Sequence, residues 1–508
     1  MTQQSARSRA GGLLRIFSTS RQLYNPTDPI PSQLMAADPR LSQAATLAGS
    51  AKLAAVTSLV DKLTNDLETV NLLPHQRDAA LEELKIYGRD PRNADPIFTK
   101  AGIEMLTRHA FNSPSSTTSR NALRCLCNAL FLEKKCRQMY VDLGYEAKAC
   151  SKLKNDNRDD EFLISRIIFL TTYDTNAKLA DLIDKHQLAD TVSKNLERHA
   201  RHHNDSLPSI DPMQDMALAE TLRLLFNITY HCHDKVSSFT QAVPHIVSLL
   251  CKTPPFTSDK PLDAPTGPLV NALSNLDLSA KEIHSALFPK TDSRLLTDRL
   301  IDILSRCRTR YDDEALETIA PSLLSVIRVL YEHAPDDVQA SIREKLLPTE
   351  EDRNEVLGRT DSLSSWMLKA SVNGLTPKLR DTISFLLFDL SDKDAGKFVE
   401  NVGYGFASGF LYNNNMSIPQ NASEAFSNGS GDSSRPVNPV TGQFLDAERH
   451  PDMPEMTEEE REREAERLFV LFERLRANGV ISVENPVRTA VEEGRFEELP
   501  DDYQEERR

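Results

Sequence analysis

Six short apolar stretches of the chain have helical spacing and end at an equivalent position, here called the slot. Asn128, Asn227 and Asn275 hold the slot in three of them, and the other three stretches run over 164–171, 323–330 and 383–389. Successive slots are about 40 to 60 residues apart, a period typical of helical solenoid repeats. The sequence therefore predicts a stack of helices. In a curved stack, such a row of asparagines can line the inner wall.

The composition favours one long all-α domain. A chain of 508 residues could form several globular domains, but repeats let one core grow because each repeat contacts only its neighbours. Hydrophobic residues make up 39% of the chain, and their runs follow helical rather than alternating spacing. No run approaches the roughly 20 apolar residues that span a bilayer, so we expect no integral membrane segment.

The seven cysteines predict reduced thiols rather than a disulfide framework, because their number is odd and most lie in apolar helical runs. Cys125 and Cys127 are two residues apart on a predicted helix and therefore point about 200° away from each other. The string His231-Cys-His233 lacks a second pair of ligands, so we expect it to pack in the core or at a helix end. Neither a metal site nor a cofactor is predicted.

The first 27 residues contain four arginines and no acid, together with a small apolar cluster. This pattern resembles a mitochondrial transit peptide. The alternatives are a disordered basic arm and an inaccurate start site, which we favour because the remainder is typical of a cytosolic interaction protein. We therefore treat residues 1–37 as an N-terminal arm.

The folded body is predicted to occupy residues 38–412, as helices joined by loops at 112–118, 199–212 and 252–268. Within it, Val402-Gly-Tyr-Gly405 predicts a tight turn between two helices, because glycine adopts backbone angles that other residues avoid. It is not a phosphate-binding loop, since the lysine and hydroxyl residue of that motif are missing from the chain.

A flexible linker is predicted at 413–437, where Asn, Ser and Gly replace large apolar residues. Residues 438–508 form an acidic segment in which a capping box, Thr457 with Glu460, precedes an amphipathic helix at about 457–478. Between 446 and 508 there are 20 acids against 10 Lys or Arg, so this part supplies −10 of the net charge of −15. Such a charge opposes binding to nucleic acid or an anionic membrane.

Four strings in this chain strongly resemble the synembryn family, the resistance-to-inhibitors-of-cholinesterase proteins. They are Asn121-Ala-Leu-Arg-Cys-Leu-Cys-Asn128, Glu220-Thr-Leu-Arg-Leu-Leu-Phe-Asn-Ile-Thr229, Val402-Gly-Tyr-Gly405 and Asn438-Pro-Val-Thr-Gly442. The resemblance runs in order from about Leu41 to about Asn485, and the last two strings are the most specific because no repeat geometry requires them. The divergent loops suggest a fungal-type member.

The resemblance implies an armadillo/HEAT-like solenoid that acts as a guanine nucleotide exchange factor and folding chaperone for heterotrimeric G-protein α subunits, in the GDP-bound or nucleotide-free state. It implies a cytoplasmic monomer, which reaches the cell cortex or membrane through its client, with no nucleic-acid partner and no catalytic residue. In such proteins the concave face holds the α subunit's C-terminal helix, and withdrawal of that helix from the nucleotide pocket releases GDP.

The resemblance also implies which residues bind the client. Lys85 and Arg89, at i and i+4 on one predicted helix face, match basic residues that contact the α subunit's C-terminus; the alternative is that they form a solvated helix face. Lys369 stands where the family has an arginine. In the same repeat, Ser364 and Trp366 replace expected basic residues, so Trp366 would offer stacking instead of charge.

Three further groups of predicted contacts have a structural alternative. The amides of Asn128, Asn227 and Asn275 can pair with a bound main chain, or they can bridge neighbouring helices. Phe226 is either an apolar contact or a core residue. Phe469 and Phe472 on the C-terminal helix resemble a second clamp on the nucleotide-binding domain, but that helix could instead pack on the last repeat.

Two other classes of function fit less of the sequence. A generic armadillo adaptor with a different peptide client would share the asparagine row, but it has no reason to carry the Asn438–Gly442 string and the capped helix. An enzyme would need a nucleophile, metal or phosphate-loop constellation, and the sequence contains no such pattern.

Overall fold

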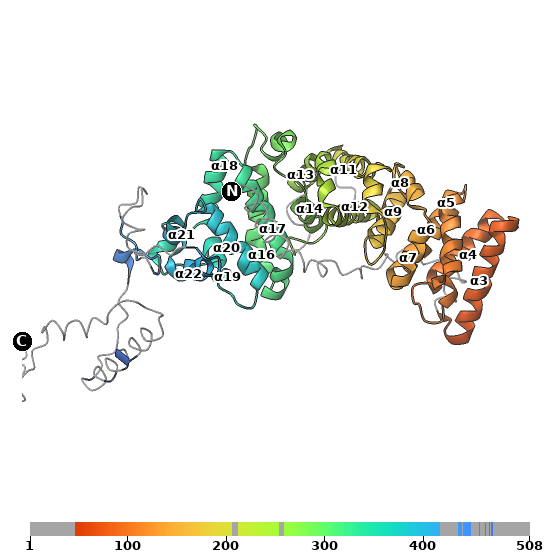
Figure 1. Cartoon of the computed structure of the whole chain (residues 1–508), viewed down its shortest axis with the longest axis horizontal. Coiled ribbons are helices and arrows are strands. Elements are labelled where there is room, and N and C mark those ends of the chain that lie inside the picture. The colour runs from red at the N-terminus through yellow and green to blue at the C-terminus, as the bar shows by residue number, and fades with distance from the viewer. Residues whose placement is uncertain are drawn as a thin grey trace, which may run out of the picture. The chain divides into compact units, whose positions relative to one another are not determined.

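The computed structural model describes residues 46–205, 212–252, 259–416, 435–438 and 440–448, and single positions at 457, 463, 467, 469 and 470. The chain divides into two compact units, of which the first ends at Asp446 and the second begins at Ala447. The first unit is an all-α solenoid in which successive helices lie side by side in chain order (Figure 1). No described helix is long and apolar enough to cross a lipid bilayer.

Seven helices form one layer, here called row A, in which each helix contacts the next. Row A consists of α4 (Pro74–Tyr87), α6 (Ser116–Leu132), α9 (Arg158–Thr171), α12 (Pro212–His231), α14 (Thr266–Ser274), α17 (Asp313–His333) and α20 (Pro377–Leu390). Every one of the six slot stretches lies on a row A helix or ends at its last residue or C-cap. The predicted stack is therefore confirmed, and the slots mark one layer of it.

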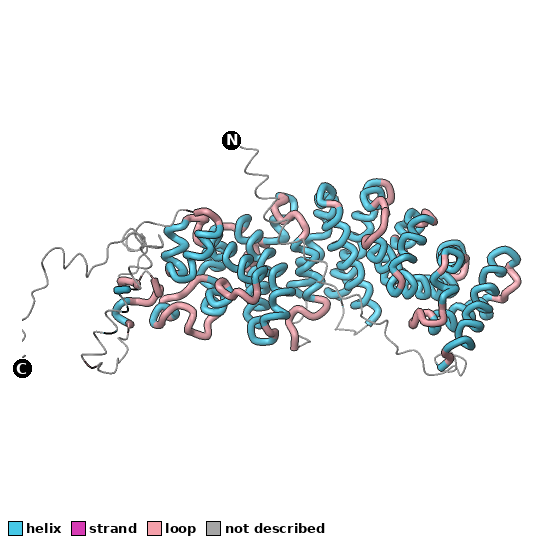
Figure 2. Tube along the Cα trace, turned by 60° about the horizontal axis from the view of Figure 1, so that its bottom comes forward, coloured by secondary structure: helices cyan, strands magenta, loops and turns pink. Residues whose placement is uncertain are grey.

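Most of the other helices contact row A directly, and the rest contact those helices. Figure 2 shows the first unit as helices joined by loops. The helices outside row A are α3 (Gly49–Thr69), α5 (Lys100–Asn112), α7 (Lys134–Asp142), α8 (Glu146–Leu153), α10 (Leu179–Asp184), α11 (Leu188–Asp205), α13 (Val243–Lys252), α15 (His284–Leu287), α16 (Leu295–Arg310), α18 (Asp336–Leu346), α19 (Leu363–Ala370), α21 (Ala395–Val402) and α22 (Tyr404–Asn413). Short 3₁₀ helices are η2 (Asp95–Phe98), η3 (His233–Ala242), η4 (Lys281–Ile283), η5 (Asp352–Asn354) and η6 (Leu445–Ala447).

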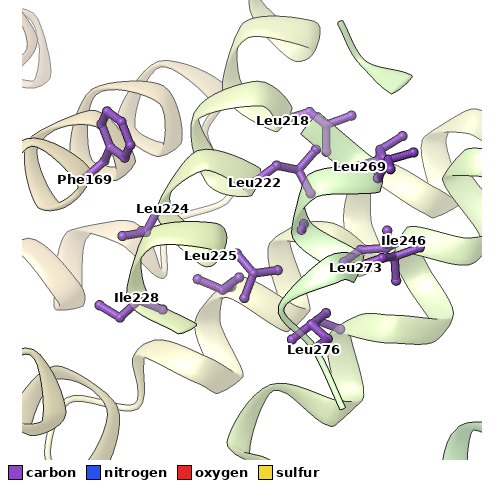
Figure 3. Close-up of a cluster of buried hydrophobic side chains, with 14 of the residues drawn as sticks. Phe169, Leu218, Leu222, Leu224, Leu225, Ile228, Ile246, Leu269, Leu273 and Leu276 are labelled. Atoms are coloured by element: carbon purple, nitrogen blue, oxygen red, sulfur yellow. The ribbon is translucent and has the colours of Figure 1, made fainter. Parts of the chain in front are cut away.

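One hydrophobic core continues through the solenoid because each row A helix is apolar on two sides. In α12, Leu222 and Leu225 are turned toward Leu269 and Leu273 of α14, whereas Leu224 lies on the side of α9 (Figure 3). This arrangement extends the core from repeat to repeat without a boundary, as the composition predicts.

Cys125 and Cys127 show the same two-sided burial on α6. The thiol of Cys125 lies 3.3 Å from the carbonyl oxygen of Leu81 on α4, and that of Cys127 lies 3.5 Å from the carbonyl oxygen of Leu163 on α9. The two sulfur atoms therefore face different neighbouring helices, as their spacing predicts. Burial raises the pKa of both thiols to about 12, so they are packing residues rather than reactive groups.

Two predictions about connections have different outcomes. Gly403 joins α21 to α22 with φ of +79°, so the predicted tight turn is confirmed. The predicted loop at 199–212 begins too early, because α11 continues to Asp205. His199 is buried, and its Nε2 lies 3.0 Å from Oε1 of Glu161 on α9, which keeps this polar stretch helical.

The end of the folded unit also differs from the sequence reading. The sequence places 413–437 in a linker and begins the acidic segment at 438, whereas residues 435–438 and 440–446 pack against the last helices of the solenoid. The amide of Leu357 donates to the carbonyl of Thr441 at 3.1 Å, and the amide of Phe444 donates to the carbonyl of Arg353 at 2.8 Å. Among the described residues, the only strand-like pairing is the bridge between Val437 and Phe444.

Asp352 holds together the loop that receives this segment. It is 3% exposed and accepts hydrogen bonds from the hydroxyl groups of Thr360 at 2.6 Å and Ser364 at 2.8 Å, and from the amide of Thr349 at 3.0 Å. Burial alone would raise its pKa, but the hydroxyl of Ser362 and these donors together bring the pKa down to about 2.

Asp352→Asn is expected to lower stability at pH 7 by at most about 2 kcal/mol, because the folded state binds the ionised carboxylate. The depressed pKa means that this stabilisation is complete above the unfolded pKa near 4 and is lost as the pH falls toward about 2. Thermal unfolding of both proteins from pH 7 to pH 2 should therefore show the difference shrinking. Asp361→Asn, which alters a fully exposed acid in the same loop, is the control and should change stability by less than about 0.5 kcal/mol.

Candidate partner-binding site

A cluster of basic side chains lies where α4 and α6 meet in row A. Lys85 is in the last turn of α4, and Arg89 follows two residues after that helix ends. Arg124 and Asn128 are four residues apart on α6 and therefore share one face of it. We call these four residues, Lys85, Arg89, Arg124 and Asn128, the basic cluster.

Lys85 is the most unusual member of the basic cluster. Its side chain is half-buried, yet no described acid lies within ion-pair distance of its ammonium group. Burial is the main cause that lowers its pKa; the positive charges of Arg124 and Arg89 act in the same direction, whereas the negative charge of Glu82 opposes them. A partly desolvated cation beside two guanidinium groups has the chemistry to bind an anion, because a carboxylate would reduce the repulsion between these positive charges.

Arg124 is held in place by one acid of the neighbouring helix α9 and by one amide of its own helix. Its guanidinium group donates to Asp159 at the start of α9 at 2.7 Å and to Asn121 at 3.1 Å. Arg89 is exposed at the edge of the cluster. The side chain of Asn128 is half-buried and makes no hydrogen bond to any described residue, so its amide is available to a partner.

The other two slot asparagines bridge neighbouring repeats. Asn227 is 5% exposed, and its amide donates to the hydroxyl of Thr172, directly after α9, at 2.8 Å. The amide of Asn275 donates to the backbone carbonyl of Phe226 on α12 at 3.1 Å. The three slots are therefore equivalent in position but differ in their hydrogen bonds, and only the slot of Asn128 has an uncommitted amide.

The remaining predicted site residues do not join the basic cluster. Phe226 is 5% exposed and belongs to the interior. Lys369 is exposed on α19, which lies among the last helices of the stack (Figure 1). Phe469 is a single described position in the second unit and is exposed, whereas Phe472 lies outside the described residues.

The repeat that carries Lys369 departs from the expected pattern for a structural reason. Ser364 is buried and donates to Asp352, so a basic side chain at this position would lose its water and break that network. Trp366 is half-buried against the core, which limits the stacking surface that the sequence suggests.

Arg124 is the member of the cluster that the sequence reading leaves out. Its signal is present in the quoted strings, because Arg124 and Arg223 each stand four residues before a slot asparagine. Arg223 also carries an acid partner, Glu220, at 2.6 Å. An arginine and a slot asparagine therefore share one helix face in two repeats, and in both repeats the arginine has an acid partner.

Comparison with known proteins finds one matching family and several relatives. The model of the family described as guanine nucleotide exchange factor synembryn matches residues 80–495. The chain is 26% identical over 298 residues to a synembryn-like chaperone of Schizosaccharomyces pombe, which covers 55% of each chain. It is 24% identical over 458 residues to Chaperone Ric-8A of Danio rerio, covering 81% of this chain and 82% of that one.

One further relative and one solved structure are also similar to this chain. Chaperone Ric-8A of Macaca fascicularis is 26% identical over 463 residues, covering 83% of this chain and 85% of its own. Among solved structures, an engineered protein with 15% identity covers 76% of this chain and 90% of its own, with a TM-score of 0.42. The chain thus spans about half of the S. pombe relative and more than four-fifths of the two vertebrate relatives.

Proposed function

This chain belongs to the guanine nucleotide exchange factor synembryn family, and on that premise we propose that it is an exchange factor and folding chaperone for heterotrimeric G-protein α subunits. Its action requires no bond to be made or broken. It binds the nucleotide-free α subunit more tightly than the GDP-bound one. By linkage, it must lower the affinity of the α subunit for nucleotide by the same factor by which nucleotide lowers the affinity of the α subunit for it. GTP then completes the cycle by displacing it.

Chaperone activity follows from the same preference. A surface that holds an open α subunit keeps its apolar parts from aggregating until nucleotide binds, because ligation of one conformation shifts the population toward it. The relatives named Chaperone Ric-8A and synembryn-like chaperone support this part of the proposal.

The observation that supports the location is the basic cluster. Lys85, Arg89 and Arg124 supply positive charge without an acid partner for Lys85, and Asn128 supplies a free amide. The terminal carboxylate of the α subunit would pair with Lys85, and the last turn of its C-terminal helix, whose carbonyl groups lack helical partners, would accept from Asn128.

Other residues would add to the interface with the α subunit. Lys369 would bind farther along the solenoid, while Asn227, Asn275 and Phe226 would act mainly by holding the repeats in register. Phe469 and Phe472 in the acidic tail would form a second clamp. We further propose that the protein works in the cytoplasm as a monomer, because one chain would supply both halves of the grip.

The decisive experiment is a binding and release assay with a GDP-loaded α subunit and a matched α subunit that lacks its last few residues. We expect the intact subunit to form a stable complex and to release GDP faster, and the shortened one to bind at least about 10-fold more weakly, because it has lost a charge-assisted contact. Failure of the intact subunit to bind would contradict the proposal. A complex that forms without faster GDP release would leave an armadillo adaptor as the better description.

A further inference from the structure

Lys52 occupies a buried position of α3, the helix that lies beside α4 at the N-terminal end of the stack (Figure 1). Val56, Val60 and Leu63 follow it at helical spacing and are also buried. Lys52 therefore stands in line with an apolar stripe, and it is only 6% exposed. Because lysine is almost never buried to this degree unless its ammonium group is paired, a partner is expected.

The partners of Lys52 are two backbone carbonyl groups of the loop that follows α4. Its ammonium group donates to the carbonyl oxygen of Asp90 at 2.7 Å and to that of Arg92 at 2.8 Å. Burial lowers the pKa of Lys52; the negative charge of Asp90 opposes this effect, and the positive charge of Arg92 adds to it. The two carbonyl groups replace the water that burial removes, so a charge-assisted contact holds the loop against α3.

This contact fixes the main chain of Arg89 from one side, and α4 fixes it from the other. The amide of Arg89 donates to the carbonyl of Ile86 in the last turn of α4 at 3.2 Å. The next carbonyl along the chain is that of Asp90, which Lys52 holds. Arg89 is therefore an exposed side chain on a fixed main chain, and α3 helps to determine where it joins the basic cluster.

Two further hydrogen bonds lie within the loop itself. The amide of Ala94 donates to the carbonyl of Pro91 at 3.1 Å, and the amide of Arg92 donates to the carboxylate of Asp90 at 3.1 Å. Both bonds join residues that are two or three positions apart, so they shape the loop without tying it to another helix. The contact from Lys52 does tie it, because it joins residues 38 and 40 positions apart.

We infer that Lys52 is a positioning residue for partner binding, which holds Arg89 where its guanidinium group can meet the carboxylate that Lys85 binds. This inference rests on the proposed function. Ordering a loop costs conformational entropy, and a complex is tighter when the loop is already ordered before binding. With Lys52 in place, the α subunit meets an ordered loop; without it, part of the binding free energy would be used to order residues 89–92.

The first test concerns the loop alone, in the full-length protein without a client. Lys52→Met keeps an unbranched side chain but removes the donors, so it should raise the hydrogen-exchange rates of the amides of Arg89 and Ala94 about tenfold and leave those of α9 unchanged. Lys52→Arg, which can still donate to both carbonyl groups, should keep the wild-type rates. Equal exchange rates in Lys52→Met and the wild-type protein would overturn the inference.

The second test is a double-mutant cycle on affinity for a GDP-loaded α subunit. Lys52→Met should weaken binding about fivefold when Arg89 is present, and by less than about 1.5-fold in the Arg89→Ala background. An equal loss in both backgrounds would overturn the inference and leave Lys52 as a structural contact only, and so would an Arg89→Ala variant that binds like wild type. If the wild-type chain binds no α subunit, the proposed function fails instead, whereas the exchange result still reports on Lys52.

Two controls separate the position of Arg89 from the charge of Lys52. Lys62→Met removes the same charge from an exposed position of α3 and should alter the affinity by less than about twofold. Lys52→Arg should bind within about twofold of wild type, because it keeps both the charge and the donors. An equal loss in Lys62→Met and Lys52→Met would overturn the inference in favour of long-range attraction. A loss of affinity in Lys52→Arg at wild-type exchange rates would overturn it as well, since the loop would then be in place without restoring binding.

Discussion

Lys85→Glu is expected to weaken the complex with an α subunit by about 100-fold, or about 3 kcal/mol. The wild-type ammonium group is half-buried beside Arg124 and Arg89 and has no described acid partner, so a bound carboxylate would gain most of its Coulomb energy there. Glutamate at this position would repel that carboxylate and would also neutralise the two arginines. Isothermal titration with a GDP-loaded α subunit measures the change.

Two controls separate this contact from a general loss of positive charge. Lys135→Glu changes the net charge equally on α7, where the side chain is exposed, and should alter the affinity by less than about twofold. An α subunit lacking its last residues should bind Lys85→Glu and wild type equally. If the loss persists with the shortened subunit, the carboxylate is not what Lys85 recognises.

The sequence predicts the layered stack well because the necessary information is local. The apolar spacing of each slot stretch determines both that it is helical and which faces it buries, so the six stretches fall on one layer of contacting helices. The Gly403 turn is predictable for the same reason, since only glycine tolerates its backbone angles readily.

The roles of individual site residues depend on neighbours that are 35 to 60 positions away in the chain. Asn128 and Asn227 hold equivalent slots, but Thr172 after α9 offers a hydroxyl to Asn227 and Asn128 has no such partner. Likewise, the predicted loop does not begin at His199, because this polar residue is buried in α11, where it contacts Glu161 of another repeat. Hydrophobic periodicity carries no signal for such pairings.

The packing of residues 435–438 and 440–446 on the solenoid could not be predicted from hydrophobic periodicity for a second reason. Val437, Val440, Phe444 and Leu445 are the few apolar residues of this stretch, and a proline and a glycine interrupt them, so their spacing predicts neither a helix nor a strand. The burial of Phe444 depends on contacts with Arg353, Leu357 and the glycine turn, through backbone hydrogen bonds and through the Arg353 guanidinium group, which donates to Gly442. The only sequence signal is the specific string Asn438 to Gly442, whose glycine is required by shape.

Glu161→Ala is expected to destabilise the middle of the solenoid by about 3 to 5 kcal/mol. Glu161 is fully buried in the first turn of α9 and joins three partners, with Arg198 at 2.6 Å, His199 at 3.0 Å and Thr221 at 2.7 Å. Burial alone would raise the pKa of Glu161, but the hydrogen bonds from His199 and Thr221 and the charge of Arg198 hold it below its ordinary value.

Removing this carboxylate would leave a largely buried guanidinium group and a buried imidazole and hydroxyl without their acceptor, so the penalty exceeds the net value of any one contact. Because solenoid repeats unfold as partly independent units, the loss should appear as faster hydrogen exchange in α9, α11 and α12, with little change in α20. Asp156→Asn provides the matched control, since Asp156 also pairs with Arg198 but its side chain is 84% exposed. A similar effect of both substitutions would mean that Arg198, rather than the buried carboxylate, holds the three helices together.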